Sequence, residues 1–214
     1  MDASKVGVLA LGSHEEKHGA ALPLDTDAKL ASHIALESAK RTGAKFLGVI
    51  FASYELPGID TGRHHALEQL IEELTATLRA AKETLGIDAV VLVNGHGGNE
   101  PLRDRLQEIE REVGMRLVFN NTIVELEGPH AATGELSMGS VTGITDVSKL
   151  AEHIDFTRYP EVGFVGLVEA HARYPWAKQH AREVGKVGIR VDKFLGDKLI
   201  GCAIADVIND VREL

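Results

Sequence analysis

The chain is organised around the stretch Val6-Gly-Val-Leu-Ala-Leu-Gly-Ser-His-Glu-Glu-Lys-His-Gly-Ala-Ala-Leu-Pro-Leu-Asp-Thr-Asp27. It opens with an apolar run typical of a buried strand, and Gly19 and Pro23 indicate that a loop follows. The loop carries Glu16 and His18, whose side chains point to the same side of an extended backbone. It ends at Asp27, where a helix is expected to begin. Carboxylate and imidazole groups in this arrangement suit a borderline cation such as Zn, Fe or Mn.

A second apolar run ends in glycines in the segment Val90-Val-Leu-Val-Asn-Gly-His-Gly-Gly-Asn99. In a parallel α/β sheet the carboxyl ends of the strands share one edge, where ligands bind. We therefore expect His96 to lie close to the polar residues of the first loop. Gly97 and Gly98 let the backbone approach a ligand, and their N–H groups at a helix start suit an anion. The alternative is that these glycines only make the tight turn after the strand.

Strand and helix patterns alternate along the chain and predict an α/β fold with three layers, α/β/α, around a mostly parallel sheet. One domain over residues 1–214 accounts for the whole pattern. Further strands are expected at 45–51, 116–120 and 162–168, and helices at 28–41, 66–85, 100–113, 147–153 and 192–212. The region 121–145 is Gly-rich and poorly periodic, which is typical of a functional loop or of misread structure.

The composition excludes several classes of protein. At 214 residues, 44% of them hydrophobic, the chain is long enough for one sizeable core. A net charge of −9 without a basic run argues against nucleic acid as a partner. No apolar run reaches membrane-spanning length and no signal core follows the N-terminus, so we expect no membrane partner and a cytoplasmic location. The single cysteine, Cys202, precludes an intrachain disulfide and is expected in the core, as are Met115 and Met138.

The stretch GSHEEKHGAALPLDTD together with NGHGGN resembles the creatininase family of metal-dependent amidohydrolases. Over nearly the whole chain the resemblance is closer to the archaeal formylamino-pyrimidine ribonucleotide deformylases of that family. It implies a creatininase-like fold with two divalent ions per chain. Glu16 and His96 would bind one ion, His18 would bind the other, and Asp27 would bridge both. Fe(II) is the expected metal, with Zn(II) or Mn(II) as alternatives, and a homo-oligomer such as a dimer is implied.

A third motif, His130-Ala-Ala-Thr-Gly-Glu-Leu-Ser137, resembles the family segment His-Ala-Gly-x-x-Glu-Thr-Ser, with Ala132 and Leu136 as departures. The resemblance implies that Glu135 completes the coordination of the second ion. It also implies that His130 serves the substrate or moves a proton. The alternative is a solvated loop glutamate and a surface histidine.

Two further features bear on the substrate. Creatininase carries a metal-binding glutamate at the position of Gly98, so this ligand is missing here, which argues against creatinine. The loop 52–65 is expected at the same edge of the sheet, where Arg63 is a candidate phosphate contact and His64 a second candidate for substrate binding. The alternative for Arg63 is an ordinary surface residue. Weaker candidates, without a spacing argument, are Arg173, Trp176 and Lys178.

The resemblance implies hydrolysis of the N-formyl group of a pyrimidine ribonucleotide, a small-molecule substrate, in archaeal riboflavin and deazaflavin coenzyme biosynthesis. Formate and the diaminopyrimidine ribonucleotide would be released. Another enzyme of the family, acting on a cyclic amide, is the first alternative and would need no phosphate contact. A non-catalytic nucleotide-binding module with one structural metal is the second, and it would leave Glu16 and Asp27 without a shared role.

Overall fold

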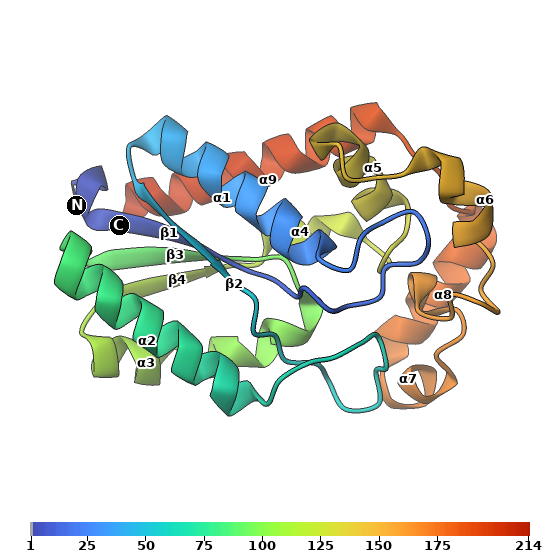
Figure 1. The fold of residues 1–214 in the computed structure, drawn as a ribbon, viewed down its shortest axis with the longest axis horizontal. Coiled ribbons are helices and arrows are strands. Elements are labelled where there is room, and N and C mark those ends of the chain that lie inside the picture. The colour runs from blue at the N-terminus through green and yellow to red at the C-terminus, as the bar shows by residue number, and fades with distance from the viewer. Residues whose placement is uncertain (1) are drawn as a thin grey trace.

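The computed structural model describes residues 2–214. Four parallel strands form one sheet in the order β2-β1-β3-β4. The strands are β1 (Val6–Leu11), β2 (Lys45–Ile50), β3 (Ala89–Asn94) and β4 (Arg116–Asn120). Helices cover both faces of the sheet (Figure 1), so the predicted three-layer α/β/α architecture is confirmed.

The two central strands explain why the sequence runs 6–11 and 89–94 are almost purely apolar. Every residue of β1 and β3 is buried, because each strand has a neighbour on both sides and helices above and below. Their register pairs Leu11 with Asn94, so both strands end at the same level. The loops that follow them therefore leave from one edge of the sheet, where the polar residues gather.

Two helical layers enclose this sheet. On one face α1 (Thr26–Thr42) and the terminal helix α9 (Lys193–Glu213) share a core with β1 and β3. On the other face α2 (Leu67–Leu85) and α3 (Leu106–Val113) pack their apolar stripes on the sheet. Helix α2 follows the predicted stripe closely and ends at Gly86 in the left-handed conformation, where a glycine carries no steric penalty. Within residues 2–214, no helix combines the length and apolar character needed to cross a membrane.

The structure corrects the sequence predictions for the middle of the chain. The charged helix expected at 100–113 is a 3₁₀ helix, η2 (Gly97–Arg105), followed by α3, and Pro101 in η2 cannot donate the backbone hydrogen bond that a helix interior uses. The region 121–145 holds two helices, α4 (Thr122–Glu127) and α5 (Thr133–Thr142). The sequence does not reveal α4 because six residues are too few to show a periodicity, and it does not reveal α5 because glycines interrupt the apolar pattern. The short helix predicted at 147–153 is confirmed as η3 (Val147–Lys149) and α6 (Leu150–His153).

The strand predicted at 162–168 is wrong. This segment contains the 3₁₀ turn η4 (Val162–Phe164), in which Gly163 and Phe164 both have positive φ. Its apolar side chains pack within a small core near α7 (Val168–Arg173) and α8 (Pro175–Val187) instead of pairing with a strand edge. Neither helix was predicted.

The terminal helix corrects the prediction for Cys202. Both methionines are buried as expected, but Cys202 is exposed. The buried stripe of α9 runs through Ile200, Ile204 and Val207, which turns Cys202 towards solvent. Apolar residues of α9 also lie outside the buried stripe, as the exposed Phe194 shows, so an apolar neighbourhood did not by itself place Cys202 in the core.

Gly12, which follows β1, is predicted to be essential for packing the start of α1 against the sheet. A Cβ at residue 12 would lie 2.5 Å from the Ala28 backbone nitrogen. We expect Gly12→Ala to lower the free energy of unfolding by about 1–3 kcal/mol, as overpacking does, measured by urea denaturation of the metal-free protein. Gly201→Ala, on α9 with open space around it, is the control and should be neutral or slightly stabilising. Equal stability of both variants would contradict the prediction.

Candidate functional site

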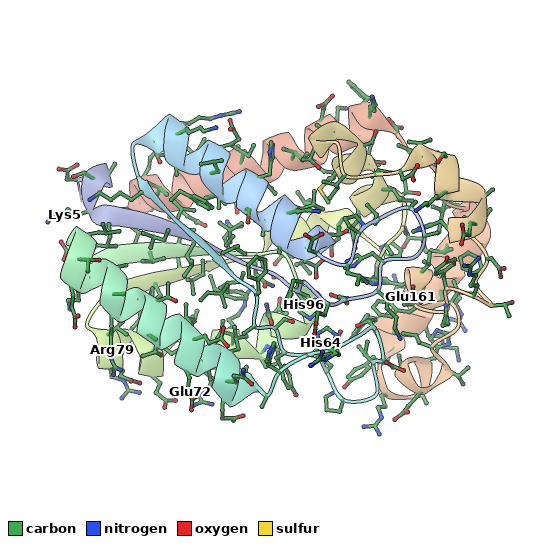
Figure 2. The ribbon with its side chains drawn as sticks, viewed as in Figure 1. Lys5, His64, Glu72, Arg79, His96 and Glu161 are labelled. Atoms are coloured by element: carbon green, nitrogen blue, oxygen red, sulfur yellow. The ribbon has the colours of Figure 1, made fainter. Side chains whose placement is uncertain are left out.

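Three segments that are distant in sequence bring the predicted polar residues together. Glu16 and His18 lie in the loop after β1, Asp27 lies in the first turn of α1, and His96 follows β3. These four side chains are buried, with relative exposures of 5% or less. Gly95 allows this approach, because a Cβ there would lie 2.7 Å from the Asp27 carbonyl oxygen. Figure 2 shows His96 and His64 next to each other beyond the carboxyl end of the sheet.

The loop between β1 and α1 is held from the opposite side by the segment 153–161. Glu161, itself buried, accepts a hydrogen bond from the Gly19 backbone N–H at 3.1 Å. His153 Nδ1 accepts one from the Ala21 N–H at 3.1 Å, while its Nε2–H donates to the Ala131 carbonyl at 2.7 Å. These buried contacts stabilise the loop that presents Glu16 and His18, and they tie it to the segment that carries His130.

His96 makes one half of the site with two carboxylates. Its Nε2–H donates to the Tyr54 carbonyl at 2.9 Å, since a carbonyl oxygen only accepts. In the neutral ring Nδ1 therefore carries the lone pair. That atom faces Glu16 Oε2 at 2.6 Å and Asp27 Oδ2 at 3.0 Å. Three electron-rich atoms thus converge on one point, which is the arrangement of a cation site with an oriented histidine ligand.

His18 makes the other half in the same way. Its Nδ1–H donates to the Glu16 carbonyl at 3.1 Å, which leaves Nε2 as the electron-pair donor. Nε2 lies 2.9 Å from Asp27 Oδ1 and 3.4 Å from Glu135 Oε2. Asp27 therefore presents one oxygen to each half. The two clusters share this carboxylate, as a bridging ligand would.

The charges of the two halves depend on one another. Burial lowers the pKa of His18, but the carboxylates of Asp27, Glu135 and Glu16 outweigh it and raise the pKa to about 10. For His96, burial is likewise outweighed by Glu16 and Asp27, and its pKa rises well above the ordinary value. Protons on the two rings balance the carboxylates in the way that divalent cations would. Cations and protons therefore compete for the same nitrogen atoms.

Two buried oxygen atoms support a metal site. Glu16 Oε2 and Glu135 Oε2 are both inaccessible to solvent and accept no well-oriented hydrogen bond among the described residues; each instead faces the ligating nitrogen of a site histidine, His96 Nδ1 and His18 Nε2 respectively. A buried carboxylate oxygen without a partner is strongly unfavourable unless it is paired or coordinates a metal. The distances therefore fit two divalent cations, one near Glu16, Asp27 and His96, the other near His18, Asp27 and Glu135. Carboxylates and imidazoles without thiolate suit Fe(II), Mn(II) or Zn(II).

His130 lies directly over the His18 half of the site. The two ring centroids are 4.5 Å apart, and His130 Nε2–H donates to the Lys17 carbonyl at 2.9 Å. Its Nδ1 lies 3.7 Å from Glu135 Oε1, an oxygen that also accepts the Ala131 backbone N–H at 3.0 Å. Glu135 is only 1% exposed, so it is not the solvated loop residue that the alternative interpretation required.

A cavity of about 320 Å³ opens onto these residues. Five of its lining residues are acidic: Glu16, Asp27, Glu55, Glu100 and Glu127. Burial and then Glu16 raise the pKa of Glu55 to about 7, although His96 opposes this. Burial and the nearby Glu135 raise the pKa of Glu127 well above its ordinary value, and bound cations would reverse that effect.

The cavity is also lined by apolar and aromatic side chains. Phe164 is one of them, with the rings of Trp176 at 5.4 Å and His180 at 6.2 Å. Helix α8 supplies the last two, and its first turn starts at Pro175, whose missing N–H has no helical partner to lose. Trp176 is partly exposed, which leaves an aromatic face available to a flat ligand.

The predicted substrate contacts are only partly in this cavity. Gly97 and Gly98 line it, whereas Arg63 and His64 do not. Arg63 is 85% exposed and forms an ion pair with Glu15 at 3.4 Å. His64 stacks on the ring of His96, with its centroid 5.1 Å away, and burial lowers its pKa to about 4.

Several residues of the cavity were missed in the sequence. Glu55 and Glu127 are isolated acidic residues without a motif, and Phe164 lies in the segment misread as a strand. His180 lies on a helix that was not predicted. The sequence carries no signal that tells these residues from other polar or aromatic residues, because Glu127 and His180 lie on helices that were not predicted and Glu55 lies in a long loop.

Comparison with known proteins identifies relatives over the full length. A sequence model of the creatininase family, described as creatinine amidohydrolase, matches residues 1–183. A protein of Methanothermobacter marburgensis is 49% identical over 214 residues, covering 100% of this chain and 92% of its own. One from Methanothermus fervidus is 47% identical over 209 residues, covering 98% and 84%. Both are named 2-amino-5-formylamino-6-ribosylaminopyrimidin-4(3H)-one 5'-monophosphate deformylase.

Solved structures share the fold at much lower identity. A creatininase crystal structure has a TM-score of 0.69 and 15% identity, covering 98% of this chain and 90% of its own. A creatininase variant described as Zn–Zn type has a TM-score of 0.67 and 17% identity, with coverages of 98% and 90%. A putative creatinine amidohydrolase of Bacteroides fragilis has a TM-score of 0.66 and 16% identity, with coverages of 98% and 89%. The family model and the full-length sequence relatives together show that this chain belongs to the creatininase family.

Proposed function

We propose that this protein hydrolyses the N-formyl group of 2-amino-5-formylamino-6-ribosylaminopyrimidin-4(3H)-one 5'-monophosphate. Formate and the corresponding diaminopyrimidine ribonucleotide are the products. The observation that carries the proposal is the pair of carboxylate–imidazole clusters that share Asp27 at the base of the cavity. The names of the full-length relatives support the choice of substrate.

Two divalent cations, Fe(II) first and Zn(II) or Mn(II) otherwise, are proposed as cofactors. Glu16 and His96 would hold one ion, His18 and Glu135 the other, and Asp27 both. Such a pair supplies a nucleophilic water at neutral pH and polarises the oxygen of the scissile amide. Tyr54 and the Glu16 backbone keep the correct imidazole nitrogen free for ligation in each half, because their carbonyls bind the other N–H.

His130 is proposed to move the proton. Its Nε2–H is committed to the Lys17 carbonyl, so Nδ1 is the atom that gains and loses a proton. Glu135 Oε1, 3.7 Å away, stabilises the ring when it is charged. In the overall step water adds its oxygen to the formyl carbon and the carbon–nitrogen bond breaks. One proton of that water passes through Nδ1 to the departing amine nitrogen.

The lining of the cavity suits an aminopyrimidinone. The aromatic side chains of Phe164, Trp176 and His180 offer stacking to the flat ring. The 2-amino group and the adjacent ring N–H are two parallel donors, which a carboxylate accepts well. Glu127 lines the cavity, so its carboxylate is available to these donors. Glu100, in contrast, already accepts a hydrogen bond from Asn121.

The cavity wall contains no Lys or Arg, so the phosphate of the substrate would lie at the mouth of the cavity. The proposed contacts there are the backbone amides of Gly97 and Gly98 and the side chain of Arg63. His64 is a further proposed contact. The same observation favours a second candidate function, hydrolysis of an uncharged cyclic amide. The two candidates differ in whether removal of the phosphate weakens substrate binding.

An oligomer and a cytoplasmic location are also proposed, on the strength of the family resemblance. Large apolar side chains are exposed along the edge strand β2 and on α1, including Phe46, Phe51 and Leu36. Strand β2 lies at the edge of the sheet, as its place in the strand order shows. An exposed apolar edge of this kind is usually covered in the native state.

The proposed function is tested by formate release from the formylamino-pyrimidine ribonucleotide after anaerobic purification, with and without added Fe(II). We expect about two metal ions per chain and metal-dependent turnover. Asp27→Ala should lose both the bound metal and the turnover. His130→Gln should keep the metal, but its turnover should fall by about 10²–10⁴-fold. Asp25→Asn, in the same loop but outside the cavity, is the control. Metal binding without formate release would instead favour the cyclic amide.

Stacking on the aromatic side chains of the cavity predicts a specific effect of Trp176→Ala. Loss of one stacking partner should raise KM by about 5–150-fold, equivalent to about 1–3 kcal/mol, with a smaller effect on kcat. Val187→Ala, an exposed position on the same helix, should leave KM unchanged. Steady-state kinetics on the ribonucleotide measure both, and an unchanged KM in Trp176→Ala would exclude stacking there.

The raised pKa of His18 predicts how the metal-free protein responds to pH. The pKa is about 10 in the fold, against 6.5 in an unfolded chain, so the bound proton stabilises the metal-free fold fully below pH 6.5. That contribution is lost as the pH rises towards 10, at about 1 kcal/mol per pH unit. Urea denaturation of the metal-free proteins between pH 7 and 10 should therefore show that the free energy of unfolding falls more steeply with pH in wild type than in His18→Gln. Parallel pH profiles would contradict this, and added metal should reverse the trend because cations displace the protons.

A further inference from the structure

Residue 98 has no side chain, and the structure leaves no room for one. A Cβ built on Gly98 would overlap the Tyr54 carbonyl oxygen, and it would lie 2.5 Å from His96 Nε2 and 2.8 Å from Glu55 Oε1. The volume beside His96 is thus filled by the loop that carries Tyr54 and Glu55. A carboxylate reaches this place from a different part of the chain.

Glu55 lies next to the first half of the site. Its side chain is 9% exposed, and its Oε2 is 3.9 Å from Nε2 of His96, the nitrogen that donates to the Tyr54 carbonyl. One donor atom each of Glu16, Glu55, His64 and His96 can be chosen so that all four lie within 4.8 Å of one another. Glu55 also lines the same cavity as Glu16 and Asp27. The buried Glu16 Oε2 accepts no well-oriented hydrogen bond and faces the lone pair of His96 Nδ1, which points to a cation in this place.

The Glu55 carboxylate is held in position by hydrogen bonds that leave it able to bind a metal. The Leu56 N–H donates to Oε1 at 2.6 Å, and the Thr61 hydroxyl donates to Oε2 at 3.1 Å. The Thr61 oxygen lies 3.2 Å from His64 Nε2, whose N–H it accepts. Each carboxylate oxygen has two lone pairs, so one remains free on each. This resembles the outer hydrogen bonds that orient metal ligands.

The charge of Glu55 also needs a partner. No Lys or Arg pairs with it within residues 2–214, and its ion-pair partner there is His96. A buried carboxylate is stable only when it is paired or coordinates a metal. A cation next to Glu16 satisfies this requirement for both residues.

We propose that Glu55 is the fourth protein ligand of the cation held by Glu16, Asp27 and His96, in place of a side chain at residue 98. This rests on the proposed two-metal function. Thr61 and His64 are then positioning residues, which act on the metal through Glu55.

The test is metal binding by the chelator-treated full-length protein, titrated with Co²⁺ by calorimetry and visible absorption. Wild type should bind two Co²⁺ ions. Glu55→Gln preserves the shape of the side chain but removes its charge. It should lower the affinity for one of the two Co²⁺ ions by roughly 100-fold or more, because loss of a residue that only hydrogen-bonds to a ligand already costs up to about 100-fold. The Co²⁺ absorption of that site should change, because its intensity follows coordination number and geometry. Thr61→Val, which removes a hydrogen bond to Glu55, should lower the affinity for the same ion by about 10–100-fold.

Glu100→Gln is the matched control, because this carboxylate lines the same cavity but is bonded to Asn121. Urea denaturation of the metal-free variants verifies that they fold. Unchanged affinity and absorption in a folded Glu55→Gln would overturn the proposal, as would an equal loss in Glu100→Gln. Loss of one ion in Glu55→Gln, with no formate release by wild type, would support Glu55 as a ligand while rejecting the proposed substrate. A wild type that binds no Co²⁺ would reject both.

Discussion

The carboxylate of Asp27, divided between His18 and His96, is the interaction on which the rest of the site depends. One oxygen lies 2.9 Å from His18 Nε2 and the other 3.0 Å from His96 Nδ1. This requires the first turn of α1 to sit against the ends of β1 and β3, which glycines at residues 12 and 95 permit. A shared, buried carboxylate couples the two halves, so the charge of one half sets the protonation of the other.

This coupling gives the cavity its chemical character. Carboxylates line the cavity, and their field raises the pKa of both site histidines despite burial. Such a lining attracts cations and repels phosphate, so the anionic part of a nucleotide belongs outside it. The aromatic side chains that also line the cavity accept a flat ring without adding charge.

Local patterns predicted the regular part of the fold well. The apolar runs of β1 and β3 and the stripe of α2 repeat the periodicity of buried strands and of a one-sided helix, and burial enforces both. The same criterion failed at 162–168, where an apolar run packs on helices and has no strand to pair with. It failed in α5, whose buried face is built from glycine, serine and glutamate as well as leucine and methionine. Apolar content predicts a buried helix or strand only where its buried face consists of apolar side chains alone.

The sequence by itself determined the parallel α/β layers and the meeting of Glu16, His18, Asp27 and His96, because parallel strands must end at a common edge. Tertiary structure alone decided which imidazole nitrogen faces the carboxylates, since carbonyls of Tyr54 and Glu16 make that choice. It also decided that Glu55, Glu127 and Phe164 line the cavity, and that Cys202 is exposed. These outcomes depend on contacts between segments far apart in the chain. No local pattern encodes such contacts, because each is fixed only when both partners are in place.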